Sequence, residues 1–162
     1  MIKYLLIFIV LFICGCKNNR FDNRKWVEYS TKDSIPQVLK LTLDTLNKSE
    51  YKNENEFKIA NPNESFNATD VVLDEELPWR QLAYLSNNET IWRLTYKHGG
   101  IGLHFHFIEC SIKENRIGYL TIGVSGQELI SRKKIERALS QHEIYFNPSI
   151  DIDSSGVIHA IF

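Results

Sequence analysis

The feature that most constrains the fold is an alternation of apolar and polar residues, divided by short polar turns, between Pro78 and Val124. Alternating segments joined by short turns are typical of β-hairpins, because successive side chains point to opposite faces of a strand. The sequence therefore predicts a four-stranded antiparallel meander over about residues 79–124. Its strands are expected at residues 81–85, 90–97, 101–112 and 117–124.

The flanking segments predict helices. Asp33 and Pro36 form a helix start, and an apolar stripe extends from there to about Asn47. Ser125 and Glu128 match a capping box, which predicts a C-terminal helix over about 126–141. Shorter strands are expected at 56–60 and 144–146, with a closing hairpin at 150–162. The fold class is α+β, with helices on one side of an antiparallel sheet.

The turns also predict which residues share a face. If Gly99 and Gly100 form a two-residue turn, Arg93 lies opposite His106. A turn at Glu114 and Asn115 places Phe107 opposite Ile122. The predicted core face, to be covered by the helix after Ser125, then contains Trp92, Leu94, Tyr96, Leu103, Phe105, Phe107, Leu120, Ile122 and Val124.

The opposite face carries the candidate ligand-binding residues Arg93, His104, His106 and Tyr119. An arginine beside two imidazoles favours a negatively charged ligand, because the guanidinium offers paired donors to carboxylate or phosphate. The alternative is that the N-terminal helix or a loop covers this face and that these side chains bond internally.

The pair His104 and His106 also raises the question of a metal. Strand alternation places the two rings on one face, about 7 Å apart along the strand. However, Glu109 is expected on the other face, Cys110 lies about 13 Å from His106 along the strand, and Arg93 would repel a cation. No metal and no cofactor are therefore predicted. A metal-dependent or acid–base enzyme that uses the histidine pair remains the alternative.

The N-terminus predicts the location of the protein. Lys3 precedes an unbroken apolar segment, Tyr4–Ile13, which is too short to span a bilayer and is typical of a secretion signal. The sequence Ile-Cys-Gly-Cys at 13–16 looks like the lipobox of bacterial lipoproteins. This resemblance implies a signal peptide at 1–15 and lipid on Cys16. We therefore expect a lipidated tether over 16–25 and a single domain over 26–162.

Composition narrows the function further. The chain has 19 Lys and Arg against 20 Asp and Glu, a formal net charge of −1, so nucleic acid is not an expected partner. Once Cys14 is cleaved and Cys16 lipidated, Cys110 has no partner for an internal disulfide. We expect a lipid-anchored cell-envelope protein, at the outer membrane because no Asp follows Cys16. Its expected role is non-enzymatic binding of an anionic ligand or an envelope protein, for example as an inhibitor or immunity-type protein.

Overall fold

The computed structural model describes residues 25–50, 56–72, 74–147, 150–152 and 158–160. The predicted signal peptide, Cys16 and all of the tether except Lys25 lie outside these residues. Among the helices that are described, none is long and apolar enough to cross a membrane.

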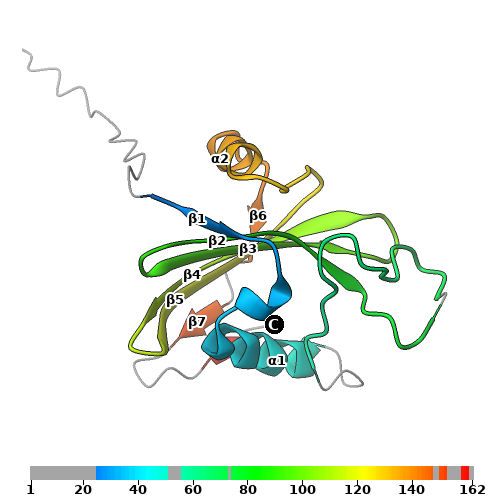
Figure 1. Cartoon of the computed structure of the whole chain (residues 1–162), viewed down its shortest axis with the longest axis horizontal. Coiled ribbons are helices and arrows are strands. Elements are labelled where there is room, and N and C mark those ends of the chain that lie inside the picture. The colour runs from blue at the N-terminus through cyan, green and yellow to red at the C-terminus, as the bar shows by residue number, and fades with distance from the viewer. Residues whose placement is uncertain (1–24, 51–55, 73, 148–149, 153–157, 161–162) are drawn as a thin grey trace, which may run out of the picture.

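The chain forms a six-stranded antiparallel sheet in the order β1-β2-β3-β4-β5-β6, with a separate antiparallel pair, β7-β8 (Figure 1). The predicted meander is confirmed as the four central strands, and the two edge strands extend it. The short strand and the closing hairpin expected near the C-terminus are also present. The strands are β1 Val27–Tyr29, β2 Arg80–Asn88, β3 Ile91–His98, β4 His104–Lys113, β5 Arg116–Ser125, β6 Tyr145–Phe146, β7 Ile150–Ile152 and β8 Ile158–Ala160.

The two α-helices, α1 (Gln37–Glu50) and α2 (Arg132–Ser140), lie on opposite faces of the sheet (Figure 1). The predicted placement of both on one side is therefore wrong. Each helix covers its own apolar cluster. Leu39 and Leu43 of α1 pack with Leu94 and Ile108 of the sheet. The second cluster, under α2, contains Tyr84, Phe105, Phe107, Leu129, Ile135, Ala138 and Ile144.

The C-terminal helix begins later than predicted. Ser125 is the last residue of β5, where its hydroxyl donates to the Glu143 carbonyl at 2.8 Å and accepts from the Gln127 amide. The N-cap is Ser131, whose side chain accepts from the Lys134 amide. Serine is a common N-cap residue, so either position could start a helix. The pairing of Ser125 within the sheet leaves Ser131 as the N-cap.

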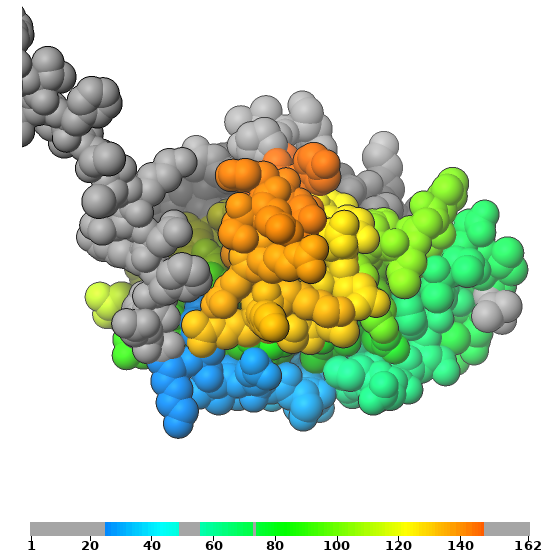
Figure 2. Space-filling view, turned by 90° about the horizontal axis from the view of Figure 1, so that it is seen from above, coloured from blue at the N-terminus to red at the C-terminus, as the bar shows by residue number. Residues whose placement is uncertain are grey.

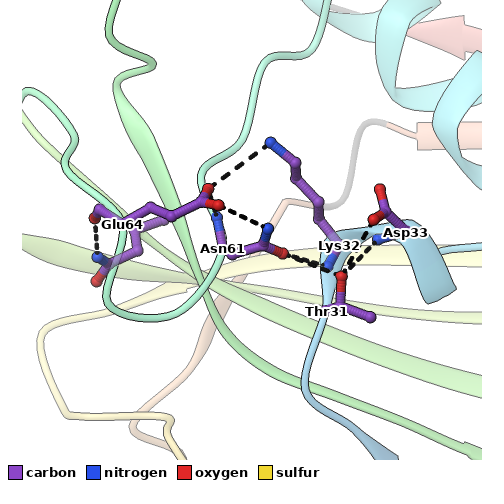
Figure 3. A network of polar contacts seen from close by, with 6 residues as sticks. Thr31, Lys32, Asp33, Asn61 and Glu64 are labelled. Carbon is purple, nitrogen blue, oxygen red and sulfur yellow. Dashed lines mark hydrogen bonds and ion pairs between the residues drawn. The ribbon is translucent and has the colours of Figure 1, made fainter.

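The N-terminal helix is confirmed, although a short 3-10 turn, η1 (Lys32–Ser34), precedes it. Figure 3 shows how this turn is fixed to a distant loop: the Asn61 side chain accepts from the Lys32 amide at 2.8 Å, and the Asn61 amide donates to Glu64. The strand expected at 56–60 is reduced to an isolated parallel bridge between Ala60 and Gln81.

The turn between β3 and β4 differs from the predicted one. Gly99 does not turn: its amide donates to the Trp79 carbonyl at 2.9 Å, and a Cβ added at Gly99 would lie 1.8 Å from the Asn67 carbonyl oxygen. The chain reverses over residues 100–103 instead, and Tyr96 pairs with His106. This register is shifted by three residues, an odd number, so every side chain of β4 changes face relative to β3.

The hairpin between β4 and β5 keeps the predicted pairing only near its turn. The register shifts beyond Ser111, so that Ile108, rather than Phe107, lies opposite Ile122. With both shifts, β4 is turned over relative to β3 and β5. The predicted core face is therefore divided between the two helices. Phe105 and Phe107 lie under α2, the helix expected to cover this face, whereas Leu94, Tyr96 and Leu120 lie on the α1 side, where the prediction is wrong. Leu103 and Val124 are exposed.

Candidate metal centre

The four candidate ligand-binding residues do not share a face. Because β4 is turned over, His104 and His106 lie on the α1 side of the sheet. Arg93 and Tyr119 lie on the α2 side, where Arg93 pairs with Glu109. The predicted placement of Arg93 opposite His106 is wrong.

On the α2 side, Arg93 bonds to groups of the protein itself. Its Nε donates to Glu109 at 2.7 Å, and its guanidinium lies 4.3 Å from the centre of the Trp26 ring. The Tyr119 hydroxyl donates to the same Glu109 carboxylate at 3.0 Å, and burial is the main cause that raises the pKa of Tyr119. The Arg93–Trp26 contact holds the first described residues of the chain against the sheet. The contacts of Arg93 and Tyr119 match the alternative in which this face bonds internally.

On the α1 side, a third histidine joins the pair. His98 is the last residue of β3 and pairs with His104, the first residue of β4, while His106 lies two residues further along the same face. One nitrogen of each ring lies within 4.8 Å of one nitrogen of each of the others. Among the described residues, this is the one group of three or more His, Cys, Asp or Glu side chains that is close enough to share an ion.

Hydrogen bonds orient the His104 ring towards this group. Its Nδ1 lies 3.0 Å from the Gly102 carbonyl oxygen, which only accepts, so Nδ1 carries the proton and Nε2 is left to face His106. A backbone carbonyl that fixes the tautomer in this way is common behind metal-binding histidines. The two Nε2 atoms are 3.0 Å apart. Two imidazoles on a tetrahedral zinc ion have nitrogens about 3.3 Å apart, given Zn–N bonds of about 2.05 Å. The His104 and His106 nitrogens therefore already lie close to the spacing of two zinc ligands, and the His98 nitrogen lies within 4.8 Å of both.

The His106 ring is held from the other side. Tyr96 stacks on it with ring centres 4.7 Å apart and planes 9° apart. Burial lowers the pKa of His106 to about 3, with further contributions from His98, His104 and Arg80. The ring is therefore neutral at pH 7, the form in which imidazole binds metals.

Sequence reasoning missed His98 because it assigned this residue to the start of the turn. A connection of five residues, 99–103, brings His98 onto the face of His104 and His106, whereas a two-residue turn places it on the opposite face. The available signal was the spacing of three histidines around a glycine-containing reversal.

Three imidazoles at this spacing can bind a borderline transition-metal ion such as Zn²⁺, Cu²⁺ or Ni²⁺, whereas Mg²⁺ and Ca²⁺ prefer oxygen ligands. Comparison of the chain with protein-family models, with curated proteins and with solved structures finds no match.

Proposed function

We propose that this chain is a lipid-anchored protein of the bacterial cell envelope whose α+β domain binds a divalent transition-metal ion through His98, His104 and His106. The observation that carries the metal-binding part is the convergence of three imidazole nitrogens within 4.8 Å at one end of β3 and β4. In this proposal the histidines bind a metal ion directly, whereas the sequence predicted that they bind an anionic ligand.

The geometry favours binding over metal-free acid–base catalysis by the histidine pair. Burial lowers the pKa of His106 to about 3, which makes it a weak base, and its Nε2 lies within hydrogen-bond distance of His104 rather than facing a carboxylate. Glu109 is the one carboxylate residue within β3 and β4. It points to the opposite face and binds Arg93. The three histidines thus lack the carboxylate that orients a histidine acting as a general base without a metal.

The metal is tested by measuring zinc content and zinc affinity of the purified full chain. We expect one Zn²⁺ per chain, and each of His98→Ala, His104→Ala and His106→Ala should weaken binding at least about tenfold, equivalent to about 1.4 kcal/mol. His142 is exposed and lies after α2, outside the group, so His142→Asn serves as the matched control. Zinc affinity that is unchanged in His98→Ala would refute a three-histidine site.

The anchor rests on the sequence of residues 13–16 and on the polar segment that follows it. Two or three acyl chains on Cys16 would hold the domain stably at a membrane, where a single chain would not. Mass spectrometry of the membrane-extracted protein should show an acylated N-terminus at Cys16. A Cys16→Ser protein that still matures and sediments with membranes would refute the anchor without affecting the metal site.

A further inference from the structure

The histidine group provides fewer ligands than a closed metal site. Structural zinc sites have four protein ligands, whereas sites that keep a position open have three. Among the described residues, three side chains reach one another and no carboxylate or thiolate joins them. Cys110 lies on the same face but is fully buried among the apolar residues under α1.

The surroundings of the group leave the metal position accessible. All three histidines are partly exposed, and the connection that follows His98 contributes Ile101 and Leu103, which are 96% and 51% exposed. A Cβ added at Gly100 or Gly102 would meet no atom within 4 Å. Figure 2 shows this connection projecting from the body of the molecule beside the loop that precedes β2.

The charge around the metal position favours a negative ligand. The three imidazoles are neutral ligands, so they leave the charge of a divalent ion uncompensated. Arg80, which pairs with His98 across β2 and β3, adds a further positive charge on this side of the sheet. It is held there by a 2.7 Å hydrogen bond to the Asn47 side chain and by the Phe57 ring, 4.7 Å away.

We infer that the metal held by His98, His104 and His106 takes a small oxyanion, a carboxylate or a phosphate, as its fourth ligand. The inference rests on the proposed metal binding and goes beyond it, because it makes the protein a metal-dependent anion binder. The anion preference expected from the sequence then resides on the α1 side of the sheet, and it comes from the metal and Arg80 rather than from Arg93.

Cobalt replaces zinc in such sites and reports on its ligands through its visible absorption. The full chain is loaded with Co²⁺ and titrated separately with acetate and with inorganic phosphate. We expect each active anion to change the visible spectrum saturably, and the response to acetate or phosphate distinguishes the two sources of oxyanion. A bound cobalt whose spectrum does not change in a large excess of both would overturn the inference, because neither oxyanion then becomes a ligand of the metal. Failure to bind Co²⁺ at all would instead refute the proposed metal site.

The charge argument has its own test. Arg80→Gln should weaken binding of the effective anion to the cobalt form about tenfold and should tighten metal binding, since it removes a charge that attracts the anion and repels the cation. Lys97, next to His98 but on the opposite face, donates to Gln81, and Lys97→Gln is the matched control. Equal effects of the two substitutions would overturn the role of Arg80. Because Arg80 is buried, the cobalt titration of the unaltered chain decides the fourth ligand even if Arg80→Gln does not fold.

Discussion

Two consecutive residues of β4, Phe107 and Ile108, test whether both faces of the sheet are buried. Each side chain is 1% exposed, although strand alternation sends them to opposite faces. Phe107 packs under α2 and Ile108 packs under α1. If only one face were covered, truncation of one of these residues would cost little. The observed architecture requires that both truncations be expensive.

The expected losses follow from burial and from the cavity that remains. Burying a large apolar side chain contributes about 1.5–3 kcal/mol. A residual cavity of about 100 Å³ after Phe107→Ala adds up to about 2.4 kcal/mol, at about 24 cal/mol per Å³. Collapse around Phe107 is restricted, because its neighbour Gly123 already lies so close to Ile144 that an added Cβ would approach it within 2.6 Å. We therefore expect losses of about 3–5 kcal/mol for Phe107→Ala and about 2–5 kcal/mol for Ile108→Ala.

Both variants are measured by equilibrium denaturation in urea, with the unfolding midpoint and slope fitted together. Lys113, exposed at the end of the same strand, provides the control: Lys113→Ala should change the free energy of unfolding by less than about 0.5 kcal/mol. A loss below about 1 kcal/mol for either core variant would show that its face is not buried and would refute the two-sided packing.

Three further predictions concern single residues. Burial raises the pKa of Cys110 to about 12, so a thiol reagent should modify it only on unfolding; rapid modification of the native protein would contradict its burial. Arg93→Ala should release Trp26 and speed tryptic cleavage of the N-terminal segment, and an unchanged rate would mean that the ring contact does not hold this segment. Gly99→Ala should destabilise the protein by at least about 1–3 kcal/mol in urea denaturation, because the new methyl group meets the Asn67 carbonyl; a neutral result would refute that close approach.

The sequence predicted the central strands well because each one is encoded locally. Alternation and polar turns specify β2 to β5 within about ten residues of chain, and the stripe after Pro36 specifies α1 in the same way. The start of α2 was less well determined. Ser125 and Ser131 are both suitable N-cap residues. Because Ser125 is paired within the sheet as the last residue of β5, the helix begins after Ser131.

The candidate site shows the limit of such local reasoning. Alternation alone placed His104 and His106 on one face, and that placement holds because it depends on β4 alone. Their companions depend on how β4 pairs with β3 and β5, and there the predicted neighbours Arg93 and Tyr119 were wrong.

What the sequence determined by itself was therefore the set of strands, the alternation within each strand, and the histidine pair. The tertiary structure alone decided that Gly99 packs against the Asn67 carbonyl and bonds to the Trp79 carbonyl instead of turning. That contact joins residues 32 positions apart, so no local pattern encodes it. It lengthens the connection to five residues, turns β4 over relative to β3, and places His98 beside His104. The physical reason is the two-residue period of a strand: a register shift of an odd number of residues exchanges the faces, and thereby decides which side chains form a site.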